Sequence, residues 1–180
     1  ANSWVSTPVV GIRNWTIEPS VPTFPALFPV FGTGVAVLSD NNFTTPSARY
    51  AYTCGFDFTN LSFPRVELFV LQDANSFNDS IAVDVSTDNG LTFTTVGSIA
   101  IENPLFNSPG WGKFEVSLGA YGGQSNVIVA IRGVVNFFSV VAVHRFRIYQ
   151  PAPIDAGVVS VDSLIDGCGL SSTSPVFVSV

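Results

Sequence analysis

The sequence has few charged residues and little variety among them. Charged side chains make up 11% of the 180 residues, against about 25% in an average soluble domain. Methionine is absent, and the single lysine is Lys113. Hydrophobic residues reach 47%, with sixteen phenylalanines, so the chain can bury a substantial core. Because the composition is so apolar, we also expect partners to cover part of the surface.

The sequence has few basic residues and no long apolar run, which bears on nucleic acid and membrane partners. Seven Lys and Arg stand against thirteen Asp and Glu, and the net charge is −6. Nucleic acid binding needs a clustered basic patch, so we expect no nucleic acid partner. A run of about 18 apolar residues, which a membrane-spanning helix needs, is also missing, and we expect no membrane insertion. No signal peptide is visible, although Ala1 is compatible with the start of a mature chain.

Histidine and cysteine, which often carry catalysis or bind metals, are scarce as well. His144 is the only histidine, and alternation along its strand predicts that it faces the core with Phe146, hydrogen-bonded to a neighbour. No nucleophile motif such as G-x-S-x-G accompanies it, so the sequence predicts no enzyme. Cys54 and Cys168 are not spaced as metal ligands. Three alternatives remain for these cysteines: they pair with each other, they pair with other chains, or they stay free.

What the sequence has in abundance is the period-two pattern of half-buried strands. In the segment 79–96, Ile81, Val83 and Val85 alternate with polar or small residues. The tripeptide 88–90, Asp-Asn-Gly, then predicts a tight hairpin turn, because type I′ turns need positive φ at two central residues. Acidic residues on the polar side of such strands are expected to be solvated. They are Glu67, Asp84 and Glu115.

The same pattern recurs along the first 150 residues, separated by turn signals, and helical periodicity is absent. It predicts one or two edge strands within 3–17 and further strands at 34–38, 48–58, 65–71, 113–118, 127–134 and 140–149. The fold class is therefore all-β, an antiparallel β-sandwich of the jelly-roll type over residues 1–150. Residues 151–180 form a linker and a two-strand extension. Two strands are too few to fold alone, so we expect a neighbouring domain or subunit to complete them.

Three stretches together resemble a known family. SIAVDVSTDNGLTF, KFEVSLGAYGGQSNVIVAIR and VVAVHRFRIYQPAP, in this order, resemble the MAM-like and cleaved-adhesin jelly-roll modules of Bacteroidota surface proteins. The resemblance covers about residues 34–153. The tail DAGVVSVDSLIDGCGLSSTSPVFVSV resembles the opening strands of an immunoglobulin-like domain that often follows such modules.

This resemblance implies a non-catalytic domain of a cell-surface or secreted protein that serves in adhesion, in carbohydrate or protein binding, or as a spacer. It also implies a structural calcium, which several relatives carry. In many of them the last strand reads I-A-I-D-N-I, with the Asp near the ion. Here His144 stands at the matching position, and a neutral imidazole is a poor ligand for a hard cation.

The most oxygen-rich stretch of the chain is the segment 72–79. Its candidate calcium ligands are Asp73, Asn75, Asn78 and Asp79. The segment lacks the glycine and the terminal glutamate of an EF-hand loop, so an ordinary polar loop is the alternative.

Aromatic residues are candidates for stacking on sugar rings. Trp4, Trp15, Trp111 and Tyr121 are considered, and Trp111 and Tyr121 are the predicted ligand-binding residues because we expect them in loops. The alternative is that Trp15 and Trp111 cap the core. Four Asn-x-Ser/Thr sequons are possible glycosylation sites, at Asn14, Asn42, Asn60 and Asn78.

The sequence thus predicts an extracellular, non-catalytic, structural or adhesive β-sandwich module. One alternative is a filament subunit that polymerises by exchange of its apolar terminal strands. Another is a carbohydrate-binding module. The expected partners are other surface proteins, glycans or further copies of the chain.

Overall fold

The computed structural model describes residues 4–23, 25–40, 45–52, 54–73, 78–101, 109–136, 139–151, 160–163 and 177–179. The chain divides into two compact units, Ala1–Gln150 and Pro151–Val180. Unit 1 contains ten strands: β1 Trp4–Val10, β2 Thr16–Glu18, β3 Val35–Ser39, β4 Ser47–Tyr52, β5 Arg65–Gln72, β6 Ser80–Ser86, β7 Thr94–Ala100, β8 Gly110–Ser117, β9 Ile128–Val134 and β10 Val140–Tyr149. A single 3₁₀ turn, η1, spans Gly119–Tyr121.

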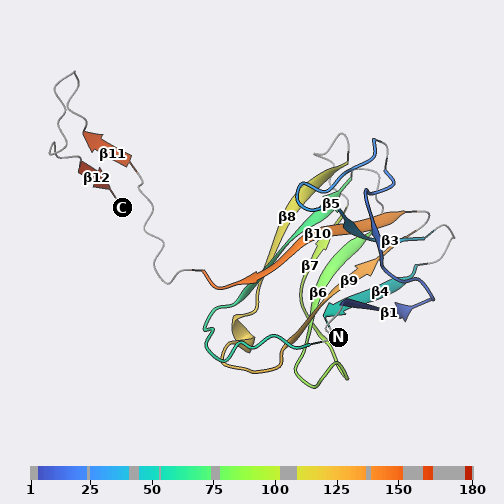
Figure 1. Cartoon of the computed structure of the whole chain (residues 1–180), viewed down its shortest axis with the longest axis horizontal. Coiled ribbons are helices and arrows are strands. Elements are labelled where there is room, and N and C mark those ends of the chain that lie inside the picture. Colours follow the sequence, from blue (N-terminus) through green and yellow to red (C-terminus); the bar gives the residue numbers. More distant parts are fainter. Residues whose placement is uncertain are drawn as a thin grey trace. The chain divides into compact units, whose positions relative to one another are not determined.

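The ten strands of unit 1 form two antiparallel five-stranded sheets (Figure 1). Sheet A has the order β1-β4-β9-β6-β7, and sheet B has the order β2-β3-β10-β5-β8. This is the predicted all-β sandwich. The proline-rich N-terminal segment supplies one edge strand to each sheet, β1 and β2, in keeping with the confinement of proline to strand edges. The mostly apolar strand β9 lies at the centre of sheet A.

The predicted hairpin joins β6 to β7, which pair antiparallel. Asn89 and Gly90 have φ values of 60° and 84°, the positive angles that a type I′ turn requires. The connection is longer than expected, because β7 begins only at Thr94. Asp88 closes the loop by accepting hydrogen bonds from the backbone N–H of Thr92, at 2.9 Å to Oδ1, and from its hydroxyl, at 2.6 Å to Oδ2.

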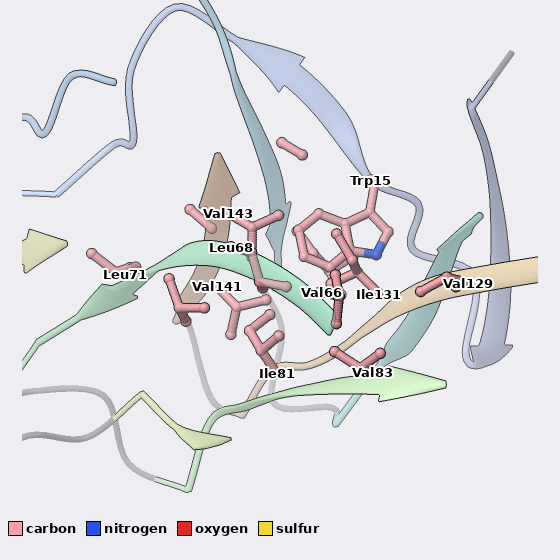
Figure 2. Close-up of a cluster of buried hydrophobic side chains, with 14 of the residues drawn as sticks. Trp15, Val66, Leu68, Leu71, Ile81, Val83, Val129, Ile131, Val141 and Val143 are labelled. Atoms are coloured by element: carbon pink, nitrogen blue, oxygen red, sulfur yellow. The ribbon is translucent and has the colours of Figure 1, made fainter. Parts of the chain in front are cut away.

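The core lies between the two sheets. Figure 2 shows aliphatic side chains of both sheets pointing toward one another, among them Leu68 of β5, Ile81 of β6 and Ile131 of β9. Trp15 joins this cluster and is 6% exposed, and its indole N–H donates to the carbonyl of Ala48 at 2.9 Å. Gly133 makes room for the indole, because a Cβ at this position would lie 2.8 Å from Trp15 Cζ2.

One end of the outer face of sheet B is covered by the proline-rich segment between β2 and β3. Val21 of this segment is fully buried and pairs with Leu27 in an isolated bridge. The indole N–H of Trp111 on β8 donates to the carbonyl of Phe28 at 2.8 Å. Phe28 and Phe31 of this segment are 64% and 52% exposed, whereas Val21 is fully buried, so packing of Val21 helps to hold the segment in place.

Unit 2 contains two strands, β11 Ser160–Ser163 and β12 Phe177–Ser179. They pair antiparallel, with Val161 opposite Val178. The two strands agree with the two-strand extension predicted for residues 151–180. A two-stranded ribbon is marginally stable at best in water, so unit 2 is still expected to need further strands.

Candidate functional site: an aromatic groove between the sheets

The candidate site is a groove between the two sheets, lined by aromatic side chains that both sheets contribute. We call it the aromatic groove and define it by Trp4 of β1, Tyr50 of β4, Phe56 and Phe146 of β10. All four side chains are half-buried. Phe56 is held by an isolated bridge to Val127.

A β-bulge in β10 directs Phe146 into this groove. The register between β10 and β5 shifts between His144 and Arg147, and Arg145 has a φ of 53°. A bulge inserts one extra residue and thereby changes the side to which the following side chain points. The prediction that His144 and Phe146 share one side is therefore wrong. Phe146 packs on aromatic rings of sheet A, whereas His144 packs on Phe69 of sheet B.

The rings of the aromatic groove contact one another in sequence. Trp4 stacks on Tyr50 with ring centroids 5.0 Å apart and an interplanar angle of 29°. The edge of Phe146 meets Trp4 at 4.9 Å and 79°, and Phe56 follows at 6.1 Å from Phe146. Offset stacks and edge-to-face pairs are the favoured arrangements of aromatic rings. The rings are thereby held in place before any ligand arrives.

Two cavities flank the contact between Trp4 and Phe146. One has a volume of about 350 Å³ and is lined by Tyr50, Ala36 and Leu68, among others. The other has a volume of about 460 Å³ and reaches Phe58. Volumes of this size and mostly apolar walls are typical of sites for small organic groups.

Polar groups at the walls of the groove are few. Burial raises the pKa of Tyr50, and its hydroxyl has no hydrogen-bond partner within the described part of the chain. Asp57 borders the second cavity. The Thr59 hydroxyl and backbone N–H donate to its carboxylate and lower its pKa. A few polar groups on an apolar wall give a site its orientation and specificity.

His144 is buried, with 5% of its surface exposed, but it is not hydrogen-bonded as predicted. Among the residues that the structure describes, neither Nδ1 nor Nε2 has a partner. The ring lies 5.2 Å from Phe69 and 4.4 Å from Trp111. Burial, followed by the charge of Arg145, lowers the pKa of His144. The ring is thus a neutral member of an aromatic cluster.

The predicted calcium ligands are only partly described, because Asn75 lies outside the described residues. Asp79 is fully buried and is hydrogen-bonded to the connection between β9 and β10. Its carboxylate accepts the backbone N–H of Asn136 at 2.6 Å and the hydroxyl of Ser139. Burial raises the pKa of Asp79 despite these hydrogen bonds. Asn78 is exposed and Asp73 is half-buried. These contacts give Asp79 a structural role, and calcium binding stays a prediction.

The two predicted ligand-binding aromatics are not brought together. Trp111 lies near the start of β8, not in a loop as expected, and Tyr121 ends η1 beyond the other end of that strand. A strand rises about 3.3 Å per residue, so roughly 20 Å separate the two ends of β8. Both side chains are partly buried against hydrophobic residues, Trp111 doing so on the outer face of sheet B.

The pairing of the two cysteines and the glycosylation of the four sequons both stay predictions. Cys54 is exposed, and Cys168 lies outside the described residues, so their relationship stays open. The sequon asparagines Asn14, Asn60 and Asn78 are exposed, and Asn42 lies outside the described part.

In the described ranges of the chain no group of three or more His, Cys, Asp or Glu side chains is placed to hold a metal ion. The same ranges form no helix with the length and apolarity that crossing a membrane requires.

The fold of unit 1 is that of a β-sandwich jelly-roll module. No family model matches the sequence, and no curated protein matches it. Solved structures do match, at sequence identities that establish a common fold and nothing more.

Two of these structures are cleaved adhesin domains of Lys-gingipain from Porphyromonas gingivalis W83. The K3 domain has a TM-score of 0.59 at 16% identity, covering 82% of this chain and 91% of that domain. The K1 domain has a TM-score of 0.54 at 18% identity, covering 83% and 91%. The carbohydrate-binding module TmCBM61, solved with β-1,4-galactotriose, has a TM-score of 0.54 at 13% identity, covering 82% and 88%. The adhesin-like jelly roll expected from the sequence is thus confirmed as a fold.

Proposed function

We propose that unit 1 is a non-catalytic binding module of an extracellular or cell-surface protein, and that it attaches that protein to a glycan through the aromatic groove. The observation that carries the proposal is the set of half-buried rings, Trp4, Tyr50, Phe56 and Phe146, beside two cavities. Aromatic faces pack against the apolar C–H surfaces of sugar rings, and a tyrosine hydroxyl offers a hydrogen bond to a sugar hydroxyl.

The fold likeness supports this proposal in a limited way. One structure of similar fold was solved with a galactose oligosaccharide, and others are named adhesin domains. The extracellular location rests on the resemblance to surface-protein modules. The proposal that the module is non-catalytic is supported by the structures of similar fold, which are adhesin domains and a carbohydrate-binding module.

The experiment is a binding screen on immobilised neutral polysaccharides, with β-1,4-galactan included as a probe. We expect Trp4→Ala to lower the affinity about tenfold or more, because it removes the ring that stacks on Tyr50 and meets Phe146. Trp111→Ala is the matched control, since this tryptophan lies on the outer face of sheet B. Loss of binding in Trp111→Ala alone would move the site to the residue predicted from the sequence. Full binding by Trp4→Ala would overturn the groove as the site.

The filament alternative is favoured by one observation, that the described residues of unit 2 form a two-stranded ribbon. Such a ribbon needs further strands, and either an immunoglobulin-like continuation or a neighbouring copy would supply them. Size measurement of the chain with and without residues 152–180 separates the two. An oligomer that dissociates on truncation supports strand exchange between copies, and a monomer in both cases rejects it.

A further inference from the structure

A pair of arginines lies at the centre of the outer face of sheet A, on the side opposite the core. Arg49 of β4 and Arg132 of β9 stand directly opposite each other in the antiparallel ladder. Their chain neighbours Ala48 and Ile131 point the other way, into the core. Like charges directly opposite each other in a sheet are destabilising, so the arrangement needs a compensating anion.

A single carboxylate provides part of that compensation. Asp84 of β6 is fully buried, and its Oδ2 accepts Nε–H from Arg49 at 2.7 Å and from Arg132 at 2.9 Å. Its Oδ1 accepts the hydroxyl of Thr95 at 2.7 Å. Although burial raises the pKa of Asp84, the hydrogen bonds from Arg132, Arg49 and Thr95 lower it below the ordinary value. One negative charge therefore faces two positive charges.

The arginines retain unused hydrogen-bond donors. Within the described residues, Arg49 donates only through Nε, and Arg132 uses Nε and Nη2. Both terminal nitrogens of Arg49 and Nη1 of Arg132 have no acceptor there. The Arg49 guanidinium also lies 4.6 Å from the centre of the Phe93 ring, a cation–π contact that fixes its plane.

The two side chains are held close to the sheet and are not free to move through solvent. Their exposed fractions are 26% for Arg49 and 23% for Arg132. Apart from Phe93, which lies against the Arg49 guanidinium, the described neighbours in the adjacent strand positions of this face carry short side chains and leave the two guanidinium groups accessible. These neighbours are Ala51, Ala82, Ala130, Ser98 and Thr7.

We propose that the outer face of sheet A binds an acidic polysaccharide, with Arg49 and Arg132 holding the carboxylate of a uronic acid residue. The planar N–H fork of a guanidinium matches the two oxygens of a carboxylate. The five strands lie about 4.8 Å apart, so the face spans roughly 19 Å, enough for a chain molecule. Hydroxyl groups of Thr7 and Ser98 lie in the row of Arg49 and Arg132 and can bond sugar hydroxyls. This site is independent of the aromatic groove.

The decisive comparison uses the unmodified full chain with polygalacturonate and with its methyl ester, measured by titration calorimetry. We expect binding to the free acid and at least about tenfold weaker binding to the ester, because a lost charge-assisted hydrogen bond has that effect. Binding to the acid is expected to weaken at high salt. Equal binding to acid and ester, or binding to neither, would overturn the proposal even where no variant folds.

Variants then locate the site on the protein. Arg49→Gln is expected to weaken binding about tenfold. Arg49→Lys is expected to weaken it too, because it keeps the charge but not the fork. Arg65→Gln removes the same charge from the outer face of sheet B and is the matched control, expected to bind within about twofold of the unmodified chain. If Arg65→Gln loses as much affinity as Arg49→Gln, the attraction is general and the site does not exist.

Two further measurements distinguish this proposal from a sulfate-binding site and from the aromatic groove. If the chain binds dextran sulfate but not polygalacturonate, the assignment of the site to a carboxylate is overturned. Trp4→Ala is expected to keep polygalacturonate binding while losing neutral glycan binding. Failure of the aromatic groove and failure of the arginine pair are therefore distinguishable.

Discussion

The outer faces of the two sheets carry ion-pair networks of opposite design. On sheet B two acids, Glu67 and Glu115, stand directly opposite each other. Lys113 bridges them, with Nζ at 2.9 Å from Glu67 and 3.0 Å from Glu115. Arg147 and Arg65 add further contacts at 3.3 Å and 2.5 Å. Two carboxylates are thus served by three cations.

Sheet A inverts this arrangement. There the like-charged pair is Arg49 and Arg132, and the bridge is the single acid Asp84. Side chains of the cations on sheet B are 45% to 51% exposed, so water satisfies the donors that protein acceptors leave over. The arginines of sheet A are half as exposed and have fewer acceptors. Water can therefore satisfy the remaining hydrogen-bond donors of the cations on sheet B, whereas the arginines of sheet A keep donors that an anion could accept.

The largest effect that separates the faces is expected for Asp84→Ala. The change removes a fully buried carboxylate and leaves two guanidinium groups opposed without a bridge. We expect unfolding to become easier by about 3 kcal/mol, because breaking a buried ion pair leaves an uncompensated charge. Urea denaturation at neutral pH measures the change.

Lys113→Ala is the matched control for this prediction, since it removes the bridge of sheet B. A much smaller loss than for Asp84→Ala is expected, as for other exposed ion pairs, because Arg147 and Arg65 still serve the two acids. If the two variants lose the same stability, the contrast between the faces is wrong.

The sandwich itself was predictable because its signals are local. Val66, Leu68 and Val70 alternate over a strand, and all three are fully buried. The turn at Asn89-Gly90 follows from the backbone angles that these residues tolerate. The bulge in β10 was not predictable, since residues 140–143 are all apolar and the alternation from His144 to Ile148 continues across the bulged position. Pairing with β5, far away in the chain, imposes the extra residue.

The candidate sites were predicted less well for the same reason. Trp4 was among the aromatic candidates, but its partners come from other strands, and Phe146 reaches it only through the bulge. Asp84 was correctly placed on the outward side and wrongly expected to be solvated. Arg49 and Arg132, which cover it, lie 35 and 48 positions away in the sequence. No local pattern records which side chain will cover another across a sheet.

The second effect concerns two residues that flank Phe69 on the outer face of sheet B, Lys113 of β8 and His144 of β10. The Lys113 side chain is 51% exposed, whereas His144 is buried beside Phe69 and Trp111. His144→Phe is expected to stabilise the fold by about 1 kcal/mol, because it removes two unsatisfied buried nitrogens and keeps the ring against Phe69 and Trp111. Thermal and urea unfolding at pH 7 measure it. Marked destabilisation would mean that the imidazole is hydrogen-bonded after all.

The pH dependence gives this variant a second readout. The pKa of His144 is lowered in the folded protein. Below the ordinary histidine pKa of about 6.5, the unfolded chain therefore binds a proton that the folded chain refuses. Stability contributed by the neutral ring is present above that pH and is lost as the pH falls. His144→Phe is expected to remove this part of the pH dependence.

The smallest effect is expected for Glu115→Gln on sheet B. The Arg65 guanidinium, with Lys113 and Tyr149, lowers the pKa of Glu115 to about 2. Its contribution to stability is therefore full above the ordinary glutamate pKa of about 4.3 and disappears as the pH falls toward about 2. We expect the variant to lose less than about 1 kcal/mol at pH 7, and nothing near pH 2.

At about 1 M salt the stability difference between Glu115→Gln and the unmodified chain is expected to shrink for this exposed network, while the loss in Asp84→Ala persists because its ions are shielded from solvent. The stability of each variant is measured by urea denaturation at low and high salt. An equal salt response of the two variants would show that burial does not distinguish the two faces.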